Sequence, residues 1–201
     1  MKRLFSVLLC GFIFFIGCAP KIISIIDSAN VPFASIKAES YTILPYKIGI
    51  VFNEEFNLKI AKASEVYRDT EYIFEARLGE DMGQTLPVFL RKNFREVAVL
   101  NNLHDAGPGV DYVLVPDISR SKANVVVRMS PVPIYELTVS LKVNVFRNGH
   151  PLKYFNIIET KGMEVPRSNK EKAKRQELVQ KGFDKLMTRI YTSLGKALRQ
   201  L

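Results

Sequence analysis

The segment YELTVSLKVNVFRNGHPLKYFNII (135–158) decides the fold. Apolar and polar residues alternate strictly over 135–145, and the side chains of a strand alternate between its two faces. This alternation therefore predicts a half-buried strand. Asn148-Gly149 follows it, and this pair is the strongest short signal for a two-residue type I′ hairpin turn. We predict a long hairpin over about 134–165, in a register that makes Val145 face Leu152.

Two further segments have the apolar spacing of helices. Apolar residues recur every three or four positions over about 79–95, where Pro87 is expected to kink or restart the helix. The same spacing covers about 168–200, which opens on a capping box at 168–171. β-Branched and aromatic runs predict further strands at 47–53, 72–78, 97–100 and 111–118, the last continued or repeated by 124–129. The expected fold class is α+β, with an antiparallel or mixed sheet and the two helices packed on one face.

The final helix is expected to have two different faces. At 100° per residue, its apolar residues fall within an arc of about 120°. Six cations lie on nearly the opposite side: Lys174, Lys181, Lys185, Arg189, Lys196 and Arg199. Because surface helices are commonly rich in lysine, this side is either a solvated face or a contact for anionic lipid, lipopolysaccharide phosphates or an acidic partner.

The net charge of +9 is unevenly distributed. Residues 18–166 contain 17 Lys or Arg and 17 Asp or Glu, whereas residues 167–201 contain 10 and 3. A uniformly basic chain would point to nucleic acid, but this distribution indicates a neutral body with one basic C-terminal element. We therefore expect no nucleic-acid partner.

The N-terminus has the features of a lipoprotein signal. A positive pair at 2–3 precedes an apolar run over 4–16, which is shorter than the roughly 20 residues of a spanning helix. The stretch FIGC (15–18) resembles a bacterial lipobox, in which the cysteine, here Cys18, becomes the lipidated first residue. An uncleaved anchor and a signal peptide without lipidation are the alternatives. The resemblance implies acyl chains on Cys18 and, because Ala19 follows it, the periplasmic face of the outer membrane rather than the inner membrane.

This interpretation divides the chain into three parts. They are a signal peptide (1–17), a lipidated N-terminus and stalk (18–45), and a single α+β periplasmic domain (46–201). Three prolines break up the stalk, and its isoleucines indicate that it is partly docked or rests against the membrane or a partner. Cys10 lies within the apolar run of the leader and leaves with it.

No pattern of catalytic or metal-binding residues stands out. His104 and His150 each lie in or beside a predicted turn, where a histidine is usually solvated. The acidic pairs at 54–55 and 80–81 are expected at a strand end and a helix start. The mature chain contains no HExxH, GxSxG, phosphate-binding loop or CxxC motif. We therefore expect no catalytic residue, no metal and no cofactor, and a protein that is not an enzyme.

Several of these features together resemble small envelope lipoproteins. They are the lipobox at Cys18, the helix led by LGEDMGQTLPVFLRKNF (78–94), the strand DYVLVPDI (111–118), the hairpin around 148–149 and the amphipathic C-terminal helix. The layout is similar to the lipopolysaccharide-assembly lipoprotein that plugs an outer-membrane β-barrel, and to the auxiliary lipoprotein of ABC-type lipid transporters. Only Cys18 carries over as a functional residue.

The resemblance implies a lipid-anchored accessory subunit of an envelope transport or outer-membrane assembly system. Its partners would be the membrane, a barrel or transporter component, and anionic lipid. An edge of the hairpin at 135–165 is expected to pair with a partner strand. The alternative is a lipoprotein that binds a lipid or small apolar ligand between its sheet and its helices.

Overall fold

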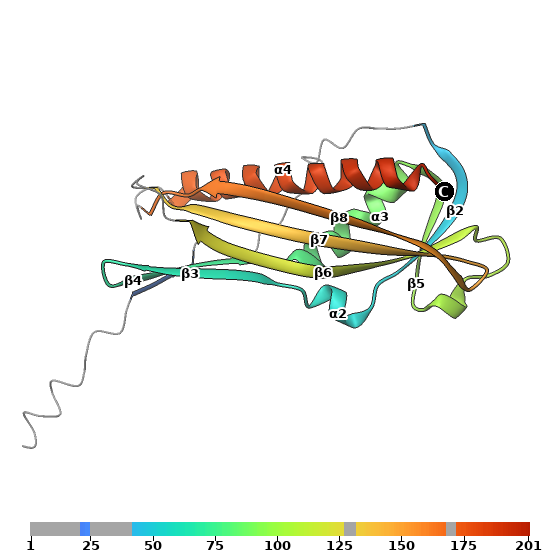
Figure 1. The fold of residues 1–201 in the computed structure, drawn as a ribbon, viewed down its shortest axis with the longest axis horizontal. Helices are drawn as coiled ribbons and strands as arrows, with labels where there is room; N and C mark the ends of the chain where they lie inside the picture. Colours follow the sequence, from blue (N-terminus) through green and yellow to red (C-terminus); the bar gives the residue numbers. More distant parts are fainter. Residues whose placement is uncertain (1–20, 25–41, 127–131, 168–171) are drawn as a thin grey trace, which may run out of the picture.

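The computed structural model describes residues 21–24, 42–126, 132–167 and 172–201. The predicted capping box at 168–171 and Cys18 lie outside these residues. Figure 1 shows an elongated molecule in which the longest helix runs along a set of long strands.

The larger sheet has five strands in the order β5-β2-β6-β7-β8. Their bounds are Phe94–Leu100, Leu44–Val51, Tyr112–Val126, Ile134–Arg147 and His150–Glu164. β2 lies parallel to both β5 and β6, whereas β6, β7 and β8 form an antiparallel meander. The sheet is therefore mixed, which is one of the two alternatives, antiparallel or mixed, that the sequence predicts.

The β7–β8 hairpin turns at Asn148 and Gly149, both with positive φ, as the type I′ prediction requires. The predicted register is wrong by one residue, because Val145 pairs with Lys153 and a β-bulge at the start of β8 takes up Leu152. Because a register shift of one residue moves each side chain to the opposite face of the sheet, Leu152 does not lie on the buried face with Val145.

β6 is one continuous strand rather than two, with an irregularity between Ile118 and Arg120. It contains Pro116, a residue that removes a backbone donor from a central strand. The ladder to β2 ends at Leu114, so Pro116 lies where β6 pairs only with β7. A proline is tolerated there because that side of the strand has no ladder to interrupt.

A second sheet has three strands in the order β1-β4-β3. β3 (Ala61–Tyr67) and β4 (Thr70–Ala76) form a hairpin, and β1 (Lys21–Ser24) pairs in parallel with β4. The strand predicted at 72–78 corresponds to β4, but β3 was not predicted. Lys, Ser and Glu interrupt its sequence, AKASEVY, so no apolar alternation marks it.

Two long helices, α3 (Leu78–Arg91) and α4 (Lys172–Leu198), cover one face of the large sheet, as predicted. The rings of Phe89 on α3 and Tyr191 on α4 stack at 4.9 Å. α3 ends at Arg91, so Phe94 belongs to β5 and not to the helix as predicted. α3 also continues through Pro87, so of the two predicted alternatives at that residue, a kink or a restart, the restart is wrong.

Two short helices complete the fold. α2 (Glu54–Asn57) is capped by the Asn53 side chain and follows β2, and the 3₁₀ helix η2 (Leu103–Asp105) lies in the predicted loop after β5. A single core cluster joins the sheets and the helices, and its largest fully buried side chains include Tyr135, Tyr191, Phe74 and Phe183.

Candidate functional site

α4 presents five of the six predicted cations to solvent, and the sixth, Arg199, directly follows the helix and is also exposed. One side of the helix is buried in the core through the following residues: Val179, Phe183, Leu186, Met187, Ile190, Tyr191, Leu194 and Leu198. The opposite side carries the exposed side chains that we call the basic face: Lys174, Lys181, Lys185, Arg189, Lys196 and Arg199. The structure therefore brings these residues together on one surface, and one of them, Arg199, reaches the Thr42 carbonyl before β2 at 3.5 Å.

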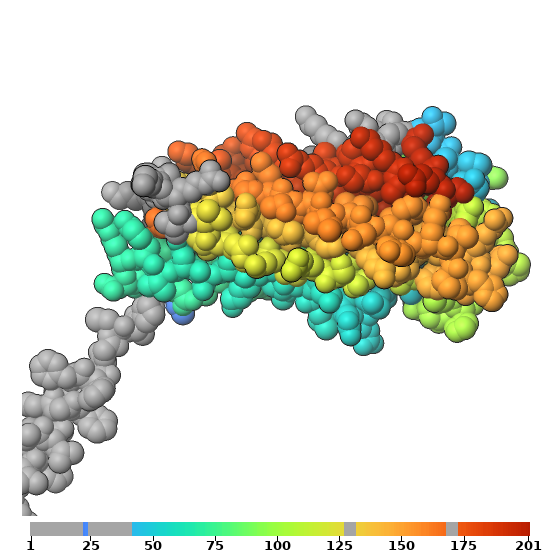
Figure 2. Space-filling view, in the orientation of Figure 1, coloured from blue at the N-terminus to red at the C-terminus, as the bar shows by residue number. Residues whose placement is uncertain are grey.

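β8 is the last strand of the large sheet, and within the described residues no strand pairs with its outer side. Three large apolar side chains on it are exposed: Leu152 (51%), Tyr154 (64%) and Ile158 (62%). We call this surface the β8 edge. Figure 2 shows β8, in orange, and α4, in red, side by side on the same face of the molecule.

An edge of this hairpin was predicted to pair with a partner strand, but the exposed apolar side chains of the β8 edge were not identified, because apolar residues occupy both faces of this strand. Phe155, Ile157 and Met163 face the core side, whereas Tyr154 and Ile158 point outward. Periodicity alone cannot choose between the two sets. The predicted register placed the outward set opposite inward residues of β7, and the bulge reverses that assignment.

A groove of about 430 Å³ lies between β8 and the C-terminal end of α4. It is lined by residues 154–159 of the strand and by Ser193, Ala197 and Gln200 of the helix. Two hydrogen bonds join the strand and the helix beside it: the Ser193 hydroxyl donates to Glu159 Oε1 at 3.2 Å, and Lys153 Nζ donates to the Gln200 carbonyl.

The basic face borders this groove. Lys196 stands three residues after Ser193 and four before Gln200, and residues at these spacings are neighbours on a helix surface. An unpaired strand edge can accept main-chain hydrogen bonds from an extended segment, and apolar side chains beside it supply contact area. The neighbouring cations favour a partner that carries negative charge.

A buried polar cluster lies between α3 and α4. The Thr85 hydroxyl donates to the Asp81 carbonyl at 2.8 Å and makes a short hydrogen bond with the Tyr191 hydroxyl. Asp81 is only 6% exposed, and its Oδ2 has no hydrogen-bond partner among the described residues. The pKa of Asp81 is raised to about 7, mainly by burial and also by the charge of Glu80, while Arg77 opposes the shift.

The acidic pair at 80–81 does start a helix, as predicted, because both residues lie in the first turn of α3. Its two members differ, since Glu80 is exposed and Asp81 is buried. No sequence signal separates them, because carboxylates favour a first helical turn whichever way they point.

An ion pair joins the two sheets at the end near the β3–β4 turn. Arg167, which follows β8, contacts Glu65 of β3 through two nitrogens at 3.1 and 2.7 Å. The Tyr135 hydroxyl of β7 donates to the same carboxylate at 2.7 Å. The Arg167 guanidinium also lies 4.2 Å from the centre of the Tyr67 ring. Burial and the Glu65 carboxylate raise the pKa of Tyr135 well above its usual range, so this cluster holds its hydroxyl proton.

The two histidines are exposed, as expected of turn residues. His104 lies in η2 and lines a hollow of about 320 Å³ beside the turn of the β7–β8 hairpin. Across the described ranges, no group of three or more His, Cys, Asp or Glu side chains is placed to hold a metal ion. A search of the same residues finds no helix with the length and apolar character needed to span a membrane.

Comparison with known proteins finds likeness in fold. The chain is similar to a Xanthomonas campestris protein of the family model DUF330, with a TM-score of 0.49, 11% identity, and 87% of this chain and 92% of that one covered. It is also similar to a minor lipoprotein from Acinetobacter baumannii, with a TM-score of 0.43, 12% identity and coverage of 78% and 95%. For the uncharacterized lipoprotein B of Nitrosomonas europaea the TM-score is 0.41, with 12% identity and coverage of 77% and 87%.

No family model and no curated protein sequence matches the chain. The chain is thus similar in structure to small bacterial lipoproteins at low sequence identity.

Proposed function

We propose that the chain is a lipid-anchored accessory subunit of a bacterial cell-envelope transport or outer-membrane assembly system. It is held through Cys18 at the periplasmic face of the outer membrane and acts by binding a protein partner, without turnover. The partner is a barrel or transporter component that adds an extended, acidic segment to the β8 edge.

The observation that carries this proposal is the β8 edge itself. Three large apolar side chains are exposed on an end strand of 15 residues, beside a groove and a row of cations. Proteins usually protect such an edge with charges, prolines or a covering element, because an open edge pairs with other chains. In β8, Pro151 and the β-bulge stand only at the start of the strand, and Leu152, Tyr154 and Ile158 are exposed.

The alternative, a lipid or small apolar ligand held between the sheet and the helices, requires an internal cavity. Tyr135, Phe183 and Tyr191 are fully buried in that layer and belong to one packed cluster. No specific observation favours a ligand there, so partner binding is the function that we propose.

Photocrosslinking in cells tests the proposal. A photoreactive amino acid at position 154 or 158 of the full-length lipoprotein is expected to capture one envelope protein in stoichiometric yield. Ile158→Lys should abolish the adduct formed from position 154, because a charge on the edge opposes strand pairing. Val99→Lys is the matched control, since Val99 is 54% exposed on β5 at the other edge of the sheet.

Mass spectrometry of the purified complex should cover both proteins and lipids. A lipid that co-purifies without any protein partner would contradict the proposal and favour the ligand-binding alternative. Cys18→Ser separately tests the anchor: acyl labelling should disappear and the precursor should accumulate, whereas unchanged labelling would exclude lipidation at Cys18.

A further inference from the structure

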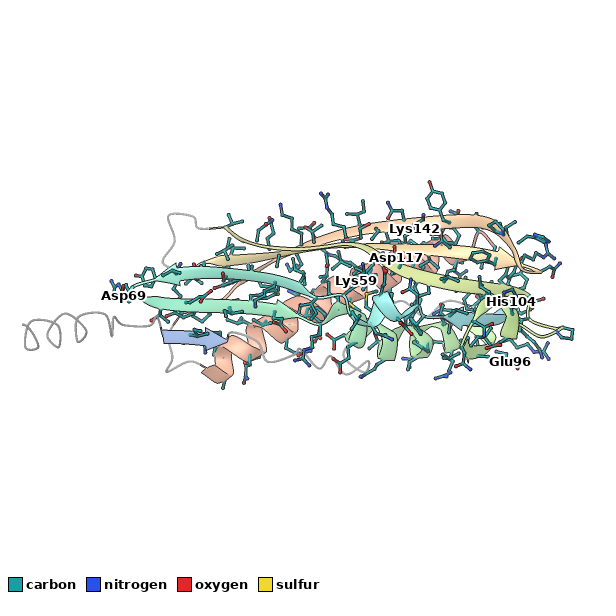
Figure 3. The ribbon with its side chains drawn as sticks, turned by 90° about the horizontal axis from the view of Figure 1, so that it is seen from below. Lys59, Asp69, Glu96, His104, Asp117 and Lys142 are labelled. Carbon is teal, nitrogen blue, oxygen red and sulfur yellow. The ribbon has the colours of Figure 1, made fainter. Side chains whose placement is uncertain are left out.

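The turn between β3 and β4 lies at one end of the molecule, and the first described strand starts beside it. Figure 3 shows Asp69 of this turn at one extremity, and His104 toward the opposite end. β1 pairs in parallel with β4, from Lys21 opposite Thr70 to Ser24 opposite Ile73. Because β4 leads away from the turn, β1 also leads away from it, so the N-terminal end of β1 at Lys21 lies on the turn side.

This direction limits where Cys18 can lie. Cys18 precedes Lys21 by three residues, and three residues span at most about 11 Å. Neighbouring strands are about 4.8 Å apart, so the turn adjoins Lys21. A lipidated Cys18 lies at the bilayer surface, where the head-group layer is roughly 5–8 Å deep. The short connection therefore holds the β3–β4 turn at that surface.

The residues around the turn suit a membrane interface. Val66 and Ile22 both pair with Glu71 from its two sides, so they share one face of the small sheet, and they are 71% and 63% exposed. Tyr67 is partly exposed, and the Arg68 guanidinium lies 5.2 Å from the centre of its ring. Tyrosine is enriched at bilayer interfaces, where its ring is in an apolar and its hydroxyl in a wet environment.

The backbone of the turn has two residues in the left-handed region. Arg68 and Asp69 have φ values of 48° and 59°, which glycine adopts with less strain. The sequence nevertheless retains an arginine there, whose long side chain can reach head-group phosphates. Arg68 and Asp69 balance each other in charge, and Glu71 adds a negative charge on the face of Val66 and Ile22, so the contact depends on apolar and aromatic groups more than on net charge.

We propose that the β3–β4 turn, with Val66, Tyr67 and Ile22, rests in the head-group layer of the bilayer that holds the acyl chains of Cys18. This inference rests on the lipidation of Cys18 in the proposed function. The turn then faces the membrane, and the β7–β8 turn and η2 at the other end point away from it, toward the periplasm.

Fluorescence quenching by spin-labelled lipid tests this orientation. The full lipidated chain carries Val66→Cys or Ile22→Cys, labelled with an environment-sensitive fluorophore, in vesicles of phosphatidylethanolamine and phosphatidylglycerol. Cys10 leaves with the leader and Cys18 is acylated, so the new cysteine is the single reactive thiol. Val99→Cys is the matched control, because it is also exposed but lies on β5.

Labels at positions 66 and 22 are expected to be quenched by a spin label placed just below the head groups, and a label at 99 is not. The quenching should persist when salt is raised from about 0.1 to 0.5 M, which screens charge but not apolar contact. Flotation with the vesicles reports the anchor independently. If the protein floats but the labels at 66 and 99 are quenched equally or not at all, the turn contact alone is overturned. If the protein does not float, the lipid anchor is overturned and this inference with it.

Discussion

Gly182 of α4 lies so close to Met163 of β8 that a Cβ atom on the glycine would be 2.3 Å from the Met163 Cγ and 2.7 Å from its Sδ. Met163 is buried, at 4% exposure. Glycine inside a helix is less favourable than alanine by about 1 kcal/mol. The absence of a side chain at this position allows α4 to pack closely against β8.

Gly182→Ala is expected to lower the free energy of unfolding by about 1–2 kcal/mol, because the overpacking strain exceeds the gain in helix propensity. Met163→Ala in the same chain should remove the clash. A double-mutant cycle measured by urea unfolding should therefore give a favourable coupling of about 1 kcal/mol or more between positions 163 and 182. Strict additivity would mean that the two residues do not limit each other.

Gly79→Ala is expected to be the more damaging glycine substitution. A Cβ there would lie 1.8 Å from the Phe56 carbonyl oxygen, and the Gly79 amide donates to the Lys59 carbonyl at 3.0 Å. Because the obstacle is backbone, α2 and α3 have to separate, and we expect a loss of at least about 3 kcal/mol.

Gly83→Ala is the matched control for this prediction. It lies in the same helix, and the nearest atom to its Cβ would be the Oδ1 of the exposed Asn57 side chain at 3.1 Å. That side chain can move, so the substitution should be neutral or stabilise the protein by up to about 1 kcal/mol. Equal losses at 79 and 83 would contradict the packing argument.

Asp81 should make the protein less stable as the pH rises. Its pKa is raised from 3.8 to about 7 by burial, so between these values the folded state holds a proton that the unfolded state releases. The free energy of unfolding should therefore fall with pH across this window, by up to about 1.4 kcal/mol per pH unit from this group.

Asp81→Asn replaces this carboxyl group with an amide, which titrates in neither the folded nor the unfolded state. The unfolding free energies of the variant and the natural chain are measured in urea from pH 4.5 to 7.5. As the pH rises, the variant should become more stable relative to the natural chain. Glu54→Gln is the control, because Glu54 is exposed and does not contribute to the raised pKa of Asp81. A difference that does not vary with pH would show that Asp81 is ionised throughout.

Charge reversal on the basic face should separate its two interpretations. Lys181→Glu, Lys185→Glu and Arg189→Glu together are expected to weaken binding of the domain to anionic vesicles or to an acidic partner, because each removes a cation near the contact. Lys62→Glu, Arg95→Glu and Lys122→Glu form the control triple, with the same change of net charge on other exposed surfaces. Equal effects of the two triples, measured by vesicle co-sedimentation, would identify the basic face as a solvated surface.

Much of the large sheet can be predicted from residues 135–149. Strict alternation places Leu137, Val139 and Leu141 on the buried face, and they are buried. The turn residues are also correct, but the register depends on a bulge two residues beyond the turn. Nothing local marks that bulge, because Leu152 is as apolar as the residues on either face of β8. Register was therefore decided by how β8 packs against α4, which is a tertiary effect.

The basic face could be predicted because helix geometry alone brings its members together. The exposed apolar side chains of the β8 edge, the parallel pairing of β1 and the burial of Asp81 could not, since each depends on residues distant in sequence. Thr70 opposite Lys21 is one example, and Tyr191 near Asp81 is another. A sequence read by period alone records which faces are apolar, but not which strand or helix covers them.

The parallel pairing of β1 with β4 has a mechanical consequence. Tension applied at Lys21 along the axis of β1 does not unzip the strand from its end pair by pair. The four register pairs from Lys21 to Ser24 are instead loaded together in shear. A pull applied there is thus transmitted through β4 into the body of the domain, so the pairing of β1 with β4 resists peeling.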